Sequence, residues 1–516
     1  MKLKNIKISD IANKPLLEGL ELTFPDRTAD YLNANCLIGV NGSGKSQFLE
    51  TIAEIFIYLD ALYRKANVMK GTSSPFSFEI TYSLTRDNKQ YLVNITQRNK
   101  NIKPPTIIIT DDDGKIISFT EEEVDSYLPE KVIGYTSGEN ETISIPFHAY
   151  YDVYATYTAS RAIEGLSKKD YEPRFYFMDY NTNLGIVISN LVFEEVDGID
   201  YLKNELKIGK LKSFQLILQT NQAAAPKIKT SSGESGVILT QELKKWRDHL
   251  INSATCYDYD EKHNKYTLDF YFNDSTKDAL AFFFKSAYNL YTALYKFELL
   301  NNLMIDATTR KNIERERKRR KLITKMPTVA NKDKVLNYSE LKLQLSNDQV
   351  IDYLSLSDGE HQFFNIFGTI IMVNHINSLF LLDEPETHFN PKWRRLFISH
   401  LKNLTKDRKQ DLFLTSHSPF IVSDTPKESV YIFERESKDL ISVKPPDQET
   451  FGASLDHILR MAFDMNEVIS EEALQAIKAL KEETDPTKIE EGIEKLGESS
   501  QLMPLYRRIE MLTKNK

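Results

Sequence analysis

The sequence has little cysteine and no long apolar run. Cys36 and Cys256 are its two cysteines, far apart and without neighbouring ligand spacing, so neither a disulfide framework nor a structural zinc site is indicated. No segment approaches the roughly 18 consecutive apolar residues of a membrane span. Residues 1–11, MKLKNIKISDI, lack the apolar centre of a signal peptide. These absences predict a cytoplasmic location.

Sustained heptad repeats and a strong overall charge are lacking too. The absence of a persistent a/d register argues against long coiled-coil arms. The formal net charge of −8 gives no general attraction to nucleic acid, so such a contact needs a local basic patch. A composition of 41% hydrophobic and 27% charged residues is typical of globular proteins. At 516 residues the chain is long enough for about two to four domains.

A glycine-rich segment, LIGVNGSGKSQFLE at 37–50, matches G-x-x-x-x-G-K-[ST] without a mismatch. An apolar stretch ends at Ile38 and a helix is expected over 45–62, which is the strand, loop and helix context of a phosphate-binding loop. In such a loop, Lys45 faces the β- and γ-phosphates and the Ser46 hydroxyl binds Mg²⁺. The predicted nucleotide-binding residues here are Gly39, Asn41, Gly42, Ser43, Gly44, Lys45, Ser46 and Gln47.

Two carboxylates follow the short apolar run at 379–382. Such a run is typical of a buried parallel strand, whose carboxyl end is where α/β sheets place ligand groups. Asp383 is therefore predicted to hold Mg²⁺ together with Ser46, and Glu384 to orient or deprotonate the attacking water. Taken alone, the pair would be interpreted as solvating a strand end, but the phosphate-binding loop favours the catalytic interpretation.

His417 follows another apolar strand, expected at 412–414. A lone histidine at a strand end is more often structural than catalytic. However, His417 lies 33 residues after Glu384 (417 − 384), which is enough for one helix and a return strand. Both strand ends can then meet at one edge of the sheet.

The segment SLSDGEHQFFNIF at 355–367 permits two interpretations. Ser357 and Glu360 form the pattern of a capping box that begins a helix. The same helix N-terminus is also a potential anion site. If it faced a nucleotide held by a second copy of the chain, Ser357 would bind the γ-phosphate.

The four motifs, in this order, resemble those of the ABC-type ATPases, specifically the soluble RecF, Rad50, SMC and OLD-like branch. This resemblance implies an α/β head with a helix-flanked mixed sheet that carries the P-loop and an antiparallel β subdomain. A large, mainly helical insertion precedes the signature motif, and a helical tail ends the chain. It also implies ATP and Mg²⁺ as cofactors and a head-to-tail dimer. By resemblance, the signature acting in trans is Ser357, Asp358, Gly359 and Glu360, the D-loop is 386–388, and His417 is the switch histidine.

The chain departs from the family pattern at three positions. Asp358 and Glu360 replace the glycine and glutamine of LSGGQ, and both replacements are familiar in the soluble branch. In VIGYTSGENE, at 132–141, Ser137 stands where the glutamine of the Q-loop is expected. Ser137, Glu139 and Asn140 are the candidates for that role.

An insertion is expected because Ser46 and Ser357 lie 311 residues apart (357 − 46). Alternating residues at 76–120 predict an antiparallel sheet with a turn at 113–114, and the aromatic-rich stretch 277–304 predicts a long helical segment. The expected organisation is a first ATPase lobe at 1–165, an inserted domain at 166–335 with a mobile loop at 220–237, a second lobe at 336–430, and a strand and helical tail at 431–516.

One segment is strongly basic. Residues 310–325, RKNIERERKRRKLITK, hold nine Lys or Arg against two Glu. The run is interpreted either as a solvated helix or linker, or as a contact with DNA or RNA phosphates. No base-reading motif accompanies it, so sequence-specific recognition is not indicated.

The tail bears on function. OLD-like nucleases carry a Toprim domain with a glutamate and a D-x-D pair after the ATPase, and neither a D-x-D nor enough length follows His417. We therefore expect an ATPase that is not itself a nuclease. The motifs, together with TFGASLDHIL at 450–459, resemble the ATPases of bacterial anti-phage systems, most of all the PtuA type of Septu and related retron systems. That resemblance implies a separate HNH nuclease partner of the PtuB type.

Two alternatives remain open. One is a RecF-like repair ATPase that loads factors on DNA. The other is a regulatory scaffold that binds ATP tightly and hydrolyses little of it.

Overall fold

The computed structural model describes residues 1–25, 32, 34–64, 74, 76–98, 104–137, 142–164, 172–179, 183–194, 196–230, 233–319, 327–406, 408, 410–437, 440–463, 465 and 469–514. The chain divides into two compact units, Met1–Gly452 and Ala453–Lys516. The first unit contains three β-sheets, and the second is helical.

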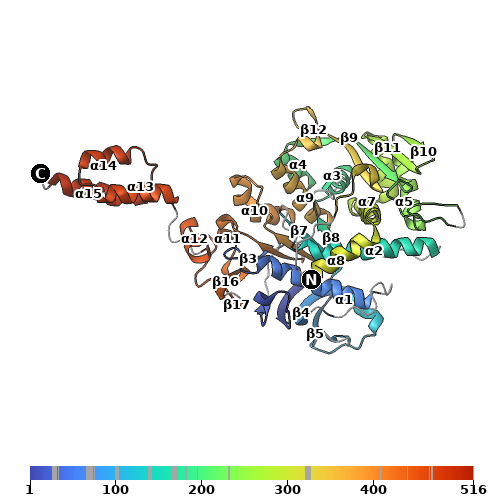
Figure 1. Ribbon diagram of the computed structural model, residues 1–516, viewed down its shortest axis with the longest axis horizontal. Helices are drawn as coiled ribbons and strands as arrows, with labels where there is room; N and C mark the ends of the chain where they lie inside the picture. The colour runs from blue at the N-terminus through green and yellow to red at the C-terminus, as the bar shows by residue number, and fades with distance from the viewer. Residues whose placement is uncertain are drawn as a thin grey trace. The chain divides into compact units, whose positions relative to one another are not determined.

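A seven-stranded sheet forms the centre of the first unit (Figure 1). Its middle strands are consecutive apolar segments buried on both faces, as expected where helices cover a parallel sheet. β14 lies between β15 and β7 and runs parallel to both. The strand order is β17 (Leu440–Lys444), β16 (Val430–Ser437), β3 (Ala34–Ile38), β15 (Asp411–Thr415), β14 (Ser378–Asp383), β7 (Lys131–Thr136) and β8 (Phe175–Met178).

Helix α1 (Lys45–Tyr63) is buried between this sheet and a second one. It contacts β14 and β15, and its Phe56 and Tyr58 rings pack against Tyr82 and Phe78 of β4. The second sheet is antiparallel and confirms the subdomain expected over 76–120, with the turn at 113–114. Its order is β2 (Glu21–Thr23), β1 (Lys2–Ser9), β4 (Ser77–Arg86), β5 (Lys89–Gln97) and β6 (Thr106–Asp111). The predicted fold class is thus confirmed.

The inserted region combines helices with strands. A third, antiparallel sheet has the order β10 (Cys256–Asp260), β11 (Lys265–Tyr271), β9 (Ile208–Gln219), β12 (Leu336–Leu345) and β13 (Val350–Asp352). The helices of this region are α3 (Asn183–Val192), α4 (Ile199–Leu206), α5 (Gln241–Ser253), α6 (Asp274–Phe284), α7 (Ala287–Leu299) and α8 (Ala307–Arg319). This region is also joined to the central sheet, because β8 pairs with β7.

The segment expected to be helical over 277–304 is helical, but it consists of α6, α7 and the 3₁₀ helix η3 (Leu300–Met304) and not of one continuous helix. The chain turns at Lys285, whose φ of 69° ends α6, and Ser286 then caps α7 through the amide of Asn289. The aromatic pattern runs through both helices, so it does not reveal the break.

Four further helices complete the first unit: α2 (Ser144–Glu164), α9 (Asp358–Met372), α10 (Pro391–Leu404) and α11 (Pro419–Ser423). Helix α2 contacts α1, β7 and β8, whereas α9 contacts α3, α4 and α10. The helix that begins at the signature motif therefore packs directly on the inserted region.

The second unit contains α12 (Leu455–Phe463), α13 (Glu471–Glu482), α14 (Pro486–Ile493) and α15 (Met503–Lys514). The end of the tail forms two helices, α14 and α15, which pack with α13 around a small apolar core. Across the part of the chain that the structure describes, no helix is both long and apolar enough to cross a membrane.

A buried ion cluster fixes the segment that leads into the short 3₁₀ helix η1 (Pro15–Leu17) against α1. Lys14 is fully buried, and its Nζ lies 2.7 Å from Glu54 Oε2 and 3.3 Å from Glu50 Oε2. Leu16 and Leu17, which follow Lys14 in the chain, lie close to Gly44 of the phosphate-binding loop. The ion cluster therefore helps to hold that loop in place.

We predict that Lys14→Met lowers the free energy of unfolding by about 3–5 kcal/mol, because it leaves Glu50 buried without its cation. The matched control is Lys7→Met, which breaks an ion pair of similar length, 2.9 Å, on the exposed surface. Urea unfolding followed by circular dichroism compares the two variants. Equal losses would contradict a stabilising role for the buried cluster.

Candidate functional site

The glycine-rich loop adopts a conformation that only glycine permits at key positions. Gly39 has φ of 133°, and a Cβ atom there would lie 2.2 Å from the Phe433 carbonyl oxygen of β16. Gly44, with φ of 89°, is the N-cap residue of α1. The Lys45 ammonium donates to the carbonyl oxygens of Gly39 (2.8 Å) and Val40 (3.1 Å), so it folds back over the loop.

Several atoms of this loop suit a polyphosphate. The buried Ser43 Oγ has no hydrogen-bond partner among the described residues and can donate to a phosphate oxygen. Gln47 Oε1 also has no partner there, but as an acceptor it suits a metal ion or its water and not a phosphate oxygen. Asn41 and Gly42 are exposed at the loop's surface. The start of α1 adds the favourable potential of a helix N-terminus. The predicted nucleotide residues are therefore contiguous and offer donors and a cation to an anionic ligand.

Asp383 is surrounded by hydroxyl groups at the carboxyl edge of the central sheet. Ser46 Oγ and Thr415 Oγ1 donate to its Oδ1 at 2.8 and 2.6 Å, and Thr136 Oγ1 donates to its Oδ2 at 3.4 Å. The structure thus brings together Ser46 and Asp383, the predicted metal ligands. Hard oxygen ligands of this kind suit Mg²⁺, which usually binds one or two carboxylates together with phosphates and water. Consistent with so sparse a protein ligand set, the described residues contain no group of three or more His, Cys, Asp or Glu that could hold a metal.

Glu384 and His417 lie together beside this pair. His417 Nε2 is 3.6 Å from Glu384 Oε1, and both side chains are partly exposed. Glu384 has a φ of 49°, and its amide donates to Thr415 Oγ1 at 3.0 Å. A strained backbone at a non-glycine residue often accompanies a functional position. The predicted general base and the histidine are therefore near neighbours at the edge where Asp383 lies.

Burial perturbs the ionisable groups of the site. Burial lowers the pKa of Lys45 to about 8, and the carboxylates of Glu384 and Asp383 oppose this shift. Burial raises the pKa of Asp383, opposed by the Thr415 and Ser46 hydrogen bonds. Burial, and then the charge of Lys45, lower the pKa of His417 to about 4, so this histidine is neutral at pH 7. A Mg²⁺ ion next to Asp383 and a polyphosphate next to Lys45 would add further opposite charge and so favour the charged form of each group.

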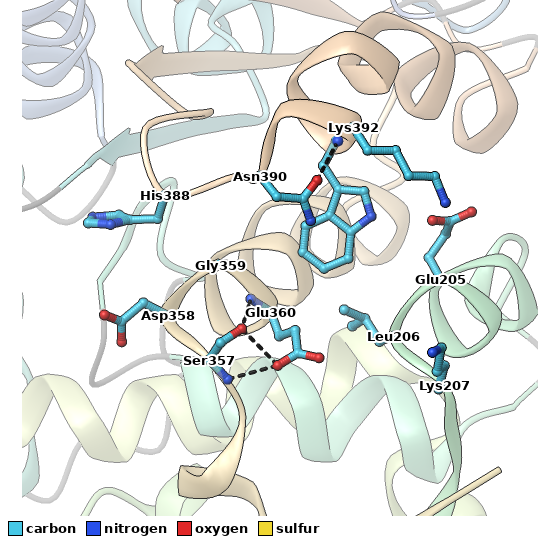
Figure 2. A pocket seen from close by; sticks show the side chains of 11 residues that line it. Glu205, Leu206, Lys207, Ser357, Asp358, Gly359, Glu360, His388, Asn390 and Lys392 are labelled. Carbon is cyan, nitrogen blue, oxygen red and sulfur yellow. Dashed lines mark hydrogen bonds between the residues drawn. The ribbon is translucent and has the colours of Figure 1, made fainter. Parts of the chain in front are cut away.

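The signature residues line a separate pocket of about 640 Å³ (Figure 2). Ser357 begins α9 in a capping box with Glu360, which confirms the local interpretation of this segment. A Cβ atom at Gly359 would lie 2.7 Å from the His388 carbonyl oxygen, so the helix start fits closely against the D-loop. The lining residues are Glu205, Leu206, Lys207, Ser357, Asp358, Gly359, Glu360, His388, Asn390, Lys392 and Trp393. None of the residues 39–47 is among them.

The Q-loop candidates are only partly described. Ser137 directly follows β7, where its amide donates to the Asp383 carbonyl oxygen at 3.1 Å and its hydroxyl to Thr387 Oγ1 at 3.1 Å. Glu139 and Asn140 lie outside the described residues.

Sequence reasoning missed the residues that hold these parts in place. Thr415 and Thr136, each opposite Asp383 in a parallel strand register, carry two of its three hydroxyl contacts. Their position at strand ends was visible in the sequence, but their register against β14 was not. Gln362 was missed too: it donates to the Tyr135 hydroxyl and accepts from the His388 amide at 3.2 Å. One buried side chain of α9 therefore joins β7 to the D-loop.

Buried hydrogen bonds link the D-loop to the segment that follows β15 and contains His417. Ser416 Oγ donates to the Glu386 carboxylate, and the Ser418 amide donates to Ser416 Oγ at 2.9 Å. Burial raises the pKa of Glu386 to about 7. These contacts couple the position of the D-loop to that of the residues around His417.

The basic segment is described only at its start. Arg310 forms an ion pair with Asp152 of α2, whereas Lys311 and Arg315 are exposed on α8. The side chains at 314 and 317–319, and residues 320–326 entirely, lie outside the described residues.

Comparison with known protein families identifies the second part of the site. Residues 213–423 match the family model described as "AAA domain, putative AbiEii toxin, Type IV TA system". Over these residues, which are fewer than half of the chain, the sequence is similar to that AAA domain family. The match contains the signature segment, Asp383, Glu384 and His417, while the phosphate-binding loop of the ATPase domain precedes it.

The chain is also similar to individual proteins. It is 31% identical over 122 residues to protein ea59 of Escherichia phage lambda, a match that covers 23% of this chain and 23% of that protein. The chain thus spans about a quarter of the length of this relative.

Solved structures of SMC heads are similar at low identity. The SMC head domain from Thermotoga maritima has 9% identity and a TM-score of 0.32, over 87% of this chain and 100% of that one. The Smc head domain from Pyrococcus furiosus, bound to the C-terminal domain of ScpA, has 11% identity and a TM-score of 0.31, over 86% and 96%. The fold of the ATPase domain described above rests on its own strand order and register.

We predict that Lys45→Ala abolishes ATP binding, because it removes the cation that faces the phosphates. Glu384→Gln keeps the shape and should retain ATP binding while slowing hydrolysis by about 10²–10⁴-fold, the worth of a general base. Nucleotide binding by fluorescence and phosphate release measure the two effects. The control is Glu21→Gln, the same substitution in an exposed ion pair. Unchanged turnover in Glu384→Gln would remove Glu384 from the mechanism.

Proposed function

We propose that this chain hydrolyses ATP·Mg²⁺ at two composite sites of a head-to-tail dimer and passes its nucleotide state to a partner. One observation carries the proposal. Ser46, Asp383, Glu384 and His417 meet at one edge of the central sheet, whereas Ser357 lines a pocket without any residue of the phosphate-binding loop. A second copy would bring its Ser357 to the nucleotide.

The mechanism assigns a step to each group of residues. Residues 39–47 bind the triphosphate through backbone amides and the Lys45 ammonium. Ser46 and Asp383 would hold Mg²⁺, which when bound neutralises charge on the phosphate oxygens. Glu384 orients the attacking water and accepts its proton, and His417, whose Nε2 lies 3.6 Å from Glu384 Oε1, can donate its ring N–H to an oxygen of the reacting phosphate.

The partner that we propose is an HNH nuclease in a bacterial anti-phage system of the Septu or retron type. The motif resemblance supports this proposal, as do the toxin description of the matching family and the similarity to a phage protein. The ATPase is proposed to restrain or license that nuclease without cutting nucleic acid itself. The basic segment 310–325 is the proposed contact with DNA or RNA.

The dimer is tested by mixing two inactive variants, Lys45→Ala and Ser357→Arg. A mixed dimer has one site with both defects and one site with neither. We expect mixing to restore up to about a quarter of the wild-type ATPase rate, since half of randomly paired dimers are mixed and each has one intact site. Ser357→Arg alone should still bind ATP at its phosphate-binding loop.

Two controls make this result decisive. If Ser357 only caps a helix, Ser357→Ala costs about 0.5–2 kcal/mol of stability, and activity falls only with the folded fraction. Titration of each inactive variant into wild type shows whether ATP hydrolysis at one site requires an active second site. No recovery, with mixed dimers formed and independent sites established, would contradict the composite site.

The partner is tested by co-expressing the chain with an HNH nuclease gene from its own genomic neighbourhood. We expect co-purification of the two proteins and a fall in phage plating efficiency of at least tenfold. Lys45→Ala should abolish the protection, because the ATPase can no longer change state. If the gene for this chain occurs without a neighbouring nuclease gene, this part of the proposal is contradicted. Protection that survives Lys45→Ala would also contradict it.

A further inference from the structure

In the single chain, both hydrogen-bond donors of Ser357 are already used. The Ser357 amide and the Ser357 hydroxyl each lie 2.8 Å from Oε2 of Glu360, and the Glu360 amide donates back to Ser357 Oγ at 3.4 Å (Figure 2). A serine hydroxyl carries one proton, so it can donate to one acceptor at a time. Ser357 therefore has no donor left while Glu360 keeps this position.

The proposed composite site requires the opposite arrangement. A phosphate oxygen can only accept hydrogen bonds from Ser357, and the negatively charged Glu360 competes for the same donors. The two anions would also repel each other across a distance of a few ångströms. The phosphate held by a second copy therefore competes with the Glu360 carboxylate for the donors of Ser357.

We propose that Glu360 is a displaceable occupant of the composite site, which holds the donors of Ser357 in the single chain and yields them to the γ-phosphate on closure. This inference rests on the proposed head-to-tail ATPase. Glu360 thereby sets the ATP concentration at which the dimer closes, because its displacement opposes closure.

The pocket has room for the displaced Glu360 carboxylate. It has a volume of about 640 Å³, and its lining includes Lys207 and Lys392 together with the acidic Glu205 and Asp358. Lys207 is the C-cap residue of α4 and Lys392 lies in the first turn of α10, so helix termini place their backbones while both side chains are exposed. Glu360 is only half-buried and can rotate within this space.

The test is Glu360→Gln, made in the Glu384→Gln background so that ATP hydrolysis does not cause the dimer to dissociate. Glutamine keeps the length of the side chain but holds Ser357 through a neutral hydrogen bond, which is roughly half as strong as a charged one. We expect ATP-driven dimerisation, measured by analytical ultracentrifugation, to occur at a 3–10-fold lower ATP concentration.

Asp358→Asn is the matched control. It removes the same charge from the same helical turn and the same pocket, but Asp358 makes no hydrogen bond to Ser357. It therefore reports the general effect of removing negative charge near the phosphate. We expect less than half of the effect of Glu360→Gln on the logarithm of the ATP concentration.

The melting temperature of the ATP-free protein separates this role from a structural one. A weaker cap should lower the melting temperature of Glu360→Gln, while its dimer forms more readily. A purely structural role would make both worse. If Glu360→Gln closes no more readily than Asp358→Asn, the inference is wrong. If the Glu384→Gln parent does not dimerise with ATP at all, the proposed function itself fails.

Discussion

The site depends on the register of three parallel strands around one buried carboxylate. Asp383 ends β14, directly opposite Thr415 of β15 and Thr136 of β7, and both hydroxyls donate to it. Ser46, from the start of α1, adds a third hydroxyl. A slip of one residue in either pairing would turn the threonine to the other face of the sheet. The arrangement of hydroxyl groups around Asp383 therefore follows from strand pairing.

The phosphate-binding loop is held from two sides. On one side, β16 approaches the loop so closely that Gly39 has no room for a Cβ atom. On the other side, α1 is packed between the central and the antiparallel sheet. Lys14 joins η1 to α1 inside the core. A loop that must present amides to a ligand without rearrangement benefits from such support, because the cost of ordering it has already been met in folding.

The signature helix connects this edge with the rest of the first unit. At its start, Gly359 touches the His388 backbone, and Gln362 joins Tyr135 to the D-loop. Further along, α9 packs on α3 and α4 of the inserted region. A shift of the helix start on dimer closure would therefore reach both the D-loop and the inserted region through direct contacts. That path would be a physical basis for the proposed transmission of nucleotide state.

The sequence alone determined the elements that bear the chemistry. The loop at 39–46, the strands before Asp383 and His417, the capping box of Ser357 and the antiparallel subdomain follow from local spacing and alternation, and the structure has each of them. The tertiary structure alone decided what lies beside them. The hydroxyls on Asp383, the bridge made by Gln362 and the break at Lys285 depend on strand register, long-range packing and a backbone turn. None of these leaves a periodic signal in the chain, because each is fixed by contacts between segments far apart in sequence or by one backbone angle.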